Sequence, residues 1–293
     1  MKTLRSITLT ILTIAAFGLV GCEDPVPTDY TEEVVLEGFV IVGEPLNNIR
    51  VFRSLPITDT FKIENASVKD AVFTVKADGT ELPIEFVDDS LGGTYRAIDT
   101  AYRALPGVTY TVEMRARGKV ITGSTKTPPL FTWVRPPADT FQYPGINNEL
   151  IRDPALDIYW TAVPGVTQYI ISMEAVDTLG YGKYLTPPTE DTNRRVRTED
   201  RFDDGTLISS ERTRYGFALQ PSTPVVWSIF KWFGKQEIQI LAPDKAFADW
   251  FRMVGFGRRS QYDYRLSSVK GGLGTWGSAS TIKWSSFLKK DKP

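Results

Sequence analysis

The chain has 293 residues, of which 42% are hydrophobic and 24% are charged, and its formal net charge is −1. This near-neutral charge provides no electrostatic footprint for nucleic acid, so no nucleic-acid partner is expected. The sequence contains no histidine, which excludes Ser-His-Asp and Cys-His catalysis and histidine-ligated zinc. Catalysis by paired carboxylates or by a lysine stays open, but the composition favours a protein that is not an enzyme.

The first 22 residues have the form of a secretory signal. Lys2 and Arg5 provide a basic start, and the apolar stretch 7–20 is too short to span a bilayer as a helix. The stretch ends in Leu19-Val20-Gly21, directly before Cys22, which is the only cysteine of the chain. Small residues before a cysteine are typical of a bacterial lipobox, where the signal peptide is removed and the cysteine carries a lipid. An ordinary signal peptide with an incidental cysteine is the alternative.

Residues 1–21 are therefore predicted to be a lipoprotein signal peptide, with Cys22 as the point of lipidation. Acylation accounts for a cysteine that has no disulfide partner in an exported protein. Each buried CH₂ of an acyl chain contributes about 0.8 kcal/mol, so several chains anchor a protein to membrane lipid without spanning it. Residues 22–34 form an acidic, proline-containing tether, in which Glu23 and Asp24 are either a surface-export signal or part of a solvated spacer.

Between residues 35 and 128, short apolar or alternating runs are separated by turn residues. A period-two pattern without helical periodicity predicts a β-sandwich in this segment. The dipeptide Asp78-Gly79 lies between two of the runs and predicts a hairpin. The predicted strands are 34–42, 49–53, 71–76, 82–87, 93–96, 110–115 and 119–122.

A second domain is predicted at 129–293, because two proline pairs indicate a boundary at its start. Runs at 156–160 and 168–174 flank a Pro-Gly turn and resemble strands B and C of a fibronectin type III module. Trp160 and Tyr169 are the expected core anchors of this module. The fold class expected is all-β, with two tandem Ig- or fibronectin III-like sandwiches.

An aromatic hairpin and one short helix are predicted near the C-terminus. Strands are expected at 225–233 and 236–241, and the first carries four aromatic residues that either form a carbohydrate platform or pack between sheets. Packing is favoured because these side chains carry large apolar areas. The helix is expected over about 244–254, where apolar residues recur at i, i+3 and i+4 and Asp244 can cap the first turn.

Three kinds of segment match chemical motifs only in part. Residues 200–211 match an EF-hand loop at four positions, but Phe202 stands where a calcium ligand is required. The glycine-rich closing segment 271–277 lacks the Lys-Ser/Thr pair of a phosphate loop, so a packing role is favoured over a binding loop. The acidic doublets at 88–89 and 203–204 are adjacent residues, which point to opposite faces of a strand and make no dyad. No metal and no cofactor are expected.

Several short motifs follow one another in an order that is similar to a known lipoprotein family. They are the lipobox, Val35-Leu36-Glu37-Gly38-Phe39-Val40, residues 67–75, Gly93-Thr94-Tyr95, residues 105–112 and residues 271–277. In this order the chain resembles the Bacteroidota lipoproteins labelled domain of unknown function 4249, although Ser268-Val269 and Trp276 depart from the usual residues of that family. The resemblance implies β-sandwich domains at the outer membrane, on the cell surface more than on the periplasmic face, beside a TonB-dependent transporter. It implies no catalytic residues.

The expected function is that of a non-catalytic binding or accessory component of an envelope system. Its expected partners are membrane lipid, through acylated Cys22, and an outer-membrane transporter or another envelope protein. The alternative is a carbohydrate- or peptide-binding surface module that uses exposed aromatic residues, for which the candidates are Trp133, Tyr143, Trp232 and Trp276. A carboxylate-based hydrolase is the third hypothesis.

Overall fold

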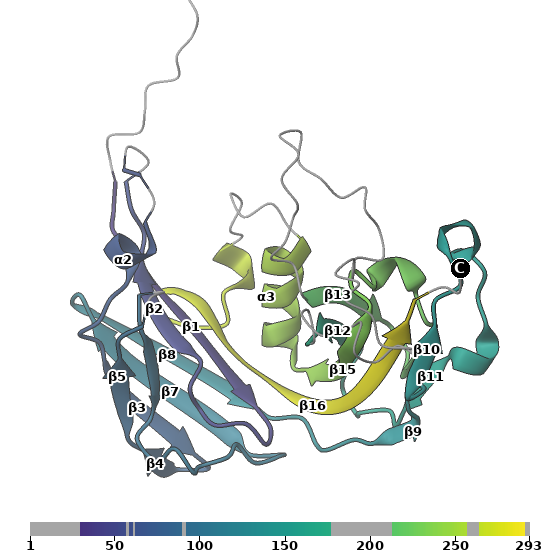
Figure 1. The fold of residues 1–293 in the computed structure, drawn as a ribbon. Helices are drawn as coiled ribbons and strands as arrows, with labels where there is room; N and C mark the ends of the chain where they lie inside the picture. The colour runs from purple at the N-terminus through teal and green to yellow at the C-terminus, as the bar shows by residue number, and fades with distance from the viewer. Residues whose placement is uncertain are drawn as a thin grey trace, which may run out of the picture.

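Two β-sandwich halves are joined by one long strand in the computed structural model of the chain (Figure 1). The structure describes residues 30–56, 59–60, 62–89, 92–176, 213–256 and 264–290. The predicted signal peptide with Leu19, Val20 and Gly21, the lipidation site Cys22, the Glu23-Asp24 pair and the segment 200–211 lie outside these residues. Among the residues described, no helix has the length and apolar character needed to cross a membrane.

Strands dominate the described chain, and the all-β prediction is confirmed. The N-terminal half contains β1 (Val34–Ile41), β2 (Ile49–Arg53), β3 (Val72–Ala77), β4 (Thr80–Leu82), β5 (Ile84–Val87), β6 (Thr94–Ala97), β7 (Thr109–Ala116) and β8 (Lys119–Lys126). The C-terminal half contains β9 (Trp133–Arg135), β10 (Thr140–Gln142), β11 (Ile158–Trp160), β12 (Tyr169–Ala175), β13 (Thr213–Ala218), β14 (Ser222–Thr223), β15 (Gly234–Pro243) and β16 (Leu273–Lys289). The α-helices of the described residues are α2 (Ile63–Ala66) and α3 (Lys245–Phe256).

One nine-stranded sheet runs through both halves. Its order is β13-β12-β15-β16-β1-β2-β6-β5, with β10 paired to the end of β16. One face of this sheet is covered by two smaller sheets, β4-β3-β7-β8 in the N-terminal half and β14-β11-β9 in the C-terminal half. The opposite face carries α3 and curves around it, as Figure 1 shows.

The joining strand is β16, which extends over 17 residues. Its first part pairs with β1 in parallel, from Leu273 to Ala279, and its second part pairs with β15 antiparallel, from Ala279 to Leu288. The last strand of the predicted second domain therefore completes the sheet of the first. As a result, the two halves share backbone hydrogen bonds along a single strand, and their junction is a sheet and not a linker.

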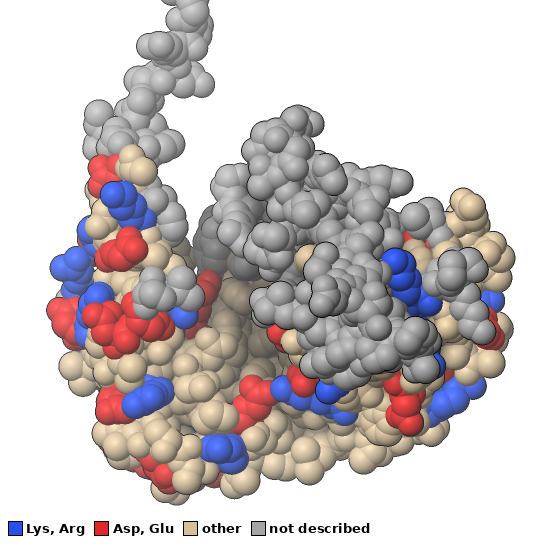
Figure 2. Space-filling view, viewed as in Figure 1, with Lys and Arg blue, Asp and Glu red and all other residues tan. Residues whose placement is uncertain are grey.

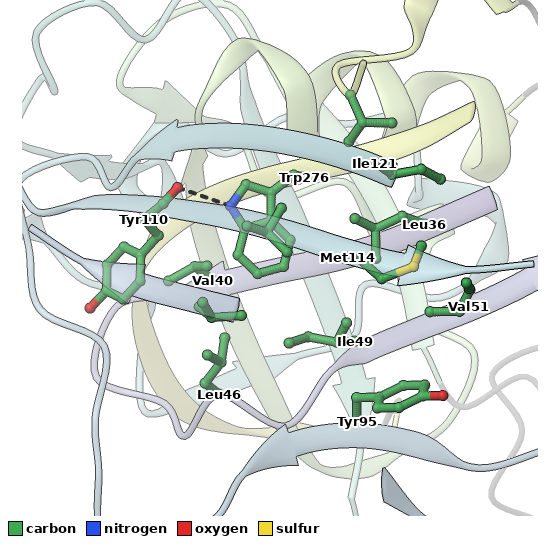
Figure 3. Packing of buried hydrophobic residues seen from close by; sticks show 14 of the residues in the cluster. Leu36, Val40, Leu46, Ile49, Val51, Tyr95, Tyr110, Met114, Ile121 and Trp276 are labelled. Atoms are coloured by element: carbon green, nitrogen blue, oxygen red, sulfur yellow. Dashed lines mark hydrogen bonds between the residues drawn. The ribbon is translucent and has the colours of Figure 1, made fainter. Parts of the chain in front are cut away.

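Trp276 of β16 lies at the centre of the N-terminal core (Figure 3). Its side chain is fully buried, and its indole Nε1 donates a hydrogen bond to the Tyr110 carbonyl of β7 at 3.0 Å. The ring fits because the facing strands carry glycine: a Cβ on Gly38 would lie 2.4 Å from the ring, and one on Gly123 would lie 2.9 Å from Trp276 Cβ. Gly274, which has a φ of +123°, lies so close to the Leu36 carbonyl that a Cβ would not fit there either. In the structure, the glycines of the closing segment therefore serve close packing.

The C-terminal half contains the aromatic clusters expected from its sequence. Trp160 and Tyr169 are both 2% exposed and meet edge to face, with ring centroids 5.2 Å apart. Trp227, Phe230 and Phe233 are buried in a second cluster with Phe141, so core packing of the 225–233 segment is confirmed. The expected strand at 225–233 is wrong, because a 3-10 turn at Trp227–Ile229 replaces it and turns these rings inward.

Local patterns set several element boundaries. The hairpin turn at Asp78-Gly79 forms with both residues at positive φ, 45° and 87°, as the Asp-Gly pair predicts. The expected strand 82–87 is divided at Pro83, which lacks an N–H for the ladder. The helix expected over 244–254 is α3, and the Phe247 N–H donates to the Asp244 carboxylate at 2.8 Å, so the capping prediction is confirmed.

Candidate functional site

A groove of about 550 Å³ lies on the curved face of the nine-stranded sheet, beside α3. Strands of both halves contribute to it, namely β1, β2, β12, β13, β15 and β16. Figure 2 shows this side of the molecule hollowed between the two halves, with acidic and basic side chains at the lower edge of the hollow. A volume of this size is within the range of small-molecule sites, about 300–1,000 Å³.

The register of the sheet aligns the polar residues on the floor of the groove. Tyr215 pairs with Ser172, Ser172 pairs with Gln239, and Gln239 pairs with Lys283. Residues that lie directly opposite one another in antiparallel strands share a face, so these four side chains form one row across β13, β12, β15 and β16. The residues next to them in sequence, such as Ile171 and Ile240, point to the opposite face and are part of the core. Strand alternation thus places a polar row on a sheet whose other face is apolar.

Glu37 of β1 is a half-buried carboxylate in the lining of the groove. Burial raises its pKa, while the Trp250 indole, which donates to Oε1 at 3.1 Å, and the charge of Arg50 act in the opposite direction. Glu37 and Arg50 are cross-strand partners on β1 and β2. The net effect is a raised pKa, which increases the protonated fraction of this carboxyl group near neutral pH.

Lys283 connects the two halves of the groove floor by ion pairs. Its Nζ lies 3.4 Å from Glu44, in the turn after β1, and 3.5 Å from Glu237 of β15. Burial lowers the pKa of Lys283, but the two carboxylates outweigh it and the pKa is raised. With Glu37 and Glu174, the lining contains four carboxylates against the two cations Arg50 and Lys283. The described part of the lining therefore contains more carboxylates than cations.

Aromatic rings form the wall of the groove on the α3 side. Trp250 packs against Phe39 with ring centroids 4.4 Å apart, and Tyr215 meets Phe251 edge to face at 5.0 Å. Tyr215 is 46% exposed, so part of its ring remains accessible to a ligand. Aromatic faces beside carboxylates suit ligands that combine apolar and hydrogen-bond-donating groups, such as sugars and peptides.

The position of α3 depends on a buried polar cluster at its N-terminus. Thr125 Oγ1 donates to the Asp244 carboxylate at 2.5 Å and lies 2.7 Å from Ser278 Oγ. These three residues come from β8, the cap of α3 and β16, so the cluster links both halves to the helix. Burial raises the pKa of Asp244, although the hydrogen bonds from Thr125, the Phe247 N–H and Ser278 counteract part of that effect.

The aromatic residues predicted as ligand contacts do not come together in one site. Trp276 and Tyr143 are 0% and 2% exposed, so their predicted exposure is corrected: both are core side chains. Trp133 is half-buried, meets Trp284 edge to face and donates to the Lys283 carbonyl at 3.3 Å. Trp232 is also half-buried, and it is not part of the groove lining. None of the four lines the groove.

Of the two predicted acidic doublets, the structure describes only the one at 88–89. Asp88 pairs with Lys69 at 3.0 Å and Asp89 with Arg50 at 3.7 Å, so each carboxylate of the first doublet has its own cation. The doublet at 203–204 lies outside the described residues. Within the described part of the chain, no group of three or more acidic, cysteine or histidine residues is placed to hold a metal ion.

The groove residues were not predicted from the sequence, since these positions are scattered over seven elements. Period-two alternation places Glu37 and Arg50 on one face of their strands, but the pairing of β1 with β16 brings that face beside Lys283. Trp250 lies within the helix predicted over about 244–254, where its apolar spacing indicates packing and not a binding site. A search for polar residues at alternating positions of otherwise apolar strands would have found Ser172, Glu237 and Gln239.

Comparison with known proteins gives matches to solved structures. No protein-family model and no curated protein matches the chain. Among solved structures, the chain is similar to the I-band fragment I67–I69 of titin at 11% identity and TM-score 0.20, over 88% of this chain and 65% of that fragment. A second titin structure, an E-to-A variant of the same three Ig domains, matches at 9% identity and TM-score 0.21, over 89% and 67%.

Proposed function

We propose that this chain is a non-catalytic binding lipoprotein, anchored to the outer membrane through acylated Cys22. The lipobox before the only cysteine supports the anchor. The resemblance to the Bacteroidota family supports an accessory role beside a TonB-dependent transporter, on the cell surface. The groove carries the binding role, because it combines polar side chains from both halves with a partly exposed aromatic wall.

The proposed partner is an envelope protein that inserts a polar segment into the groove. The excess of carboxylates favours a segment with positive charge or several hydrogen-bond donors. The shared sheet holds Glu37 and Lys283 on adjoining strands, so the groove is preorganised and little ordering cost accompanies binding.

A photo-crosslinking residue at position 215 tests this proposal in intact cells of the native host. Tyr215 is 46% exposed and lines the groove, and p-benzoylphenylalanine keeps its phenyl ring and carries a benzoyl group in place of the hydroxyl. Tyr159 is a matched control, because it is 38% exposed and lies on β11, outside the groove. A specific adduct with one envelope protein from position 215, absent from position 159, is the expected result. Equal adducts from both positions, or none from either, would contradict a binding role for the groove.

Carbohydrate binding is the second candidate, favoured by Trp250 and Tyr215 beside the groove carboxylates. It predicts a glycan adduct at position 215 in place of a protein adduct. The anchor has a separate test, in which Cys22→Ser abolishes labelling by radioactive palmitate and releases the protein from the membrane fraction. Digestion by protease added to intact cells would support the surface location, and protection until the outer membrane is broken would favour the periplasmic face.

A further inference from the structure

A cluster of charged side chains lies on the outer face of the sheet β14-β11-β9, away from the groove. Strand alternation on β11 places Ile158 and Trp160 in the core and Tyr159, which is 38% exposed, on the outer face. Arg135 of β9 pairs with Tyr159 across the ladder, and its guanidinium Cζ lies 4.7 Å from the centroid of that ring. In Figure 1, β9 and β11 lie at the end of the molecule that is remote from the N-terminal half.

Two backbone carbonyls fix the guanidinium of Arg135 above the ring. Its Nε donates to the Asp157 carbonyl at 2.5 Å, and its Nη2 donates to the Pro154 carbonyl at 2.9 Å. These carbonyls belong to the 3-10 turn Pro154–Leu156 and to the residue that follows it. The aromatic contact and the two hydrogen bonds hold Arg135 in one orientation, although the side chain is exposed.

A second arginine is held beside the first by a buried carboxylate. Arg152 donates from Nε to Asp157 Oδ1 at 3.3 Å and from Nη2 to Asp157 Oδ2. The side chain of Asp157 is 4% exposed, whereas that of Arg152 is 61% exposed. The hydrogen bond from Arg152 lowers the pKa of the Asp157 carboxyl group, and burial acts in the opposite direction. Asp157 is therefore ionised near neutral pH and holds Arg152 at the surface.

Both arginines are thus bonded to one residue, Arg135 to its carbonyl and Arg152 to its carboxylate. Within the described residues, these contacts do not involve the Nη1 group of either arginine. Asp153, on the same turn, is an exposed carboxylate that accepts a hydrogen bond from the Ala155 N–H. The cluster therefore offers both donors and an acceptor. It suits a singly charged anion with hydroxyl groups, because Asp153 would repel an anion of higher charge.

We propose that this cluster binds an acidic sugar, with the carboxylate of a uronic acid held by Arg135 and Arg152. A planar carboxylate matches the fork of a guanidinium group. Sugar hydroxyl groups can donate to Asp153, and the C–H face of the sugar can pack on Tyr159, whose exposed ring is apolar with a polar tip. This proposal is independent of the function proposed for the groove, since the cluster lies on a different sheet.

Ligand-observed NMR titration tests the proposal. The full chain is used with Cys22→Ser, so that no acyl anchor requires detergent. The probes are the methyl glycosides of galacturonic and glucuronic acid. Methyl galactoside is the neutral counterpart, and N-acetylglycine supplies a carboxylate without a sugar. We expect saturable binding of at least one uronoside at millimolar concentration, about fivefold or more weaker binding of both controls, and a loss of affinity as salt is raised.

Variants of Arg135 locate the site. Arg135→Gln removes the guanidinium group and should weaken uronoside binding by about threefold to fivefold. Arg135→Lys keeps the charge without the planar fork and should weaken binding nearly as much. Arg115→Gln is the matched control, because Arg115 is a 64% exposed arginine on β7 of the N-terminal half and its loss changes the net charge equally.

Three results would overturn the proposal. The first is the absence of saturable binding of either uronoside at millimolar concentration. The second is equal affinity for a uronoside and for methyl galactoside or N-acetylglycine, which would show that the cluster does not recognise the acid and the sugar together. The third is unchanged uronoside affinity in a folded Arg135→Gln variant. If circular dichroism shows that this variant does not fold, unchanged affinity in Arg135→Lys is the equivalent contrary result.

Discussion

The contact between Gly38 and Trp276 is predicted to be a strong energetic link between the two halves. Gly38 lies on β1, near the start of the chain, and Trp276 lies on β16, near its end. An alanine at position 38 would place its Cβ 2.4 Å from both Cε3 and Cζ3 of the indole. The ring has no space to retreat, because it is fully buried and its Nε1 is bonded to the Tyr110 carbonyl.

The size of the effect follows from these contacts. Forcing a methyl group into a packed core costs about 1–3 kcal/mol, and replacing a strand glycine by alanine returns about 0.5–1 kcal/mol. Gly38→Ala should therefore lower the free energy of unfolding by up to about 2.5 kcal/mol. Trp276→Leu removes both ring atoms and leaves the Tyr110 carbonyl without its donor, at a cost of about 2–5 kcal/mol. In the Trp276→Leu variant, the additional change Gly38→Ala should leave the free energy of unfolding unchanged or raise it.

A double-mutant cycle measures this coupling. Urea unfolding of the wild type, the two single variants and the double variant, followed by circular dichroism, should give a coupling energy of about 1–3 kcal/mol. Gly216→Ala is the matched control, because it is also a strand glycine but its new Cβ would have 3.7 Å to the nearest side chain. Additive effects within about 0.5 kcal/mol would refute the reasoning.

Two further predictions concern buried carboxyl groups. Burial raises the pKa of Glu37 above its ordinary value near 4.5, so the native state binds more protons than the unfolded state between the two values, and stability falls as pH rises through that window. Glu37→Gln should remove this fall and be the more stable protein at pH 7; identical pH profiles of the urea midpoint for both proteins would contradict it. Asp244→Ala should cost about 1–2 kcal/mol through loss of the α3 cap, whereas Asp244→Asn, which keeps the acceptor without the buried charge, should cost much less. Equal midpoints for the two Asp244 variants would show that capping is not the cause.

Local sequence patterns predicted most strands but not their arrangement. Short apolar or alternating runs located β1, β2, β3, β7 and β12 within one or two residues; β7 alternates between buried and more exposed positions, whereas β12 is buried along nearly its whole length. The Asp78-Gly79 turn and the Asp244 cap were also predicted, since both depend on neighbouring residues only. Patterns of this kind carry no information about which strands pair when their residues are far apart in sequence, as Val35 and Leu273 are.

The glycine-rich segment shows most clearly what the pattern leaves out. Glycine is depleted in strands, so residues 271–277 were not predicted as a strand, although β16 begins at Leu273. The close approach of β1 and the insertion of Trp276 depend on long-range strand pairing. At these positions they favour glycine within a strand, although glycine is ordinarily depleted there. The same pairing explains why Trp276 was considered a ligand contact: its burial is decided by residues 38 and 123, which are remote in sequence.

The alternation of β16 connects the stability of the fold with the proposed binding site. Trp276 and Ser278 point into the layer between β16 and the smaller sheet, where they bond to Tyr110 and Thr125. Gly277 and Lys283 are at odd positions and face the other way, toward α3 and the groove. One strand therefore holds the core of the N-terminal half on one face and the groove floor on the other. A substitution that shifts β16 would move Lys283 relative to Glu44 at the same time, so loss of packing at Trp276 should weaken partner binding without any change in the groove side chains.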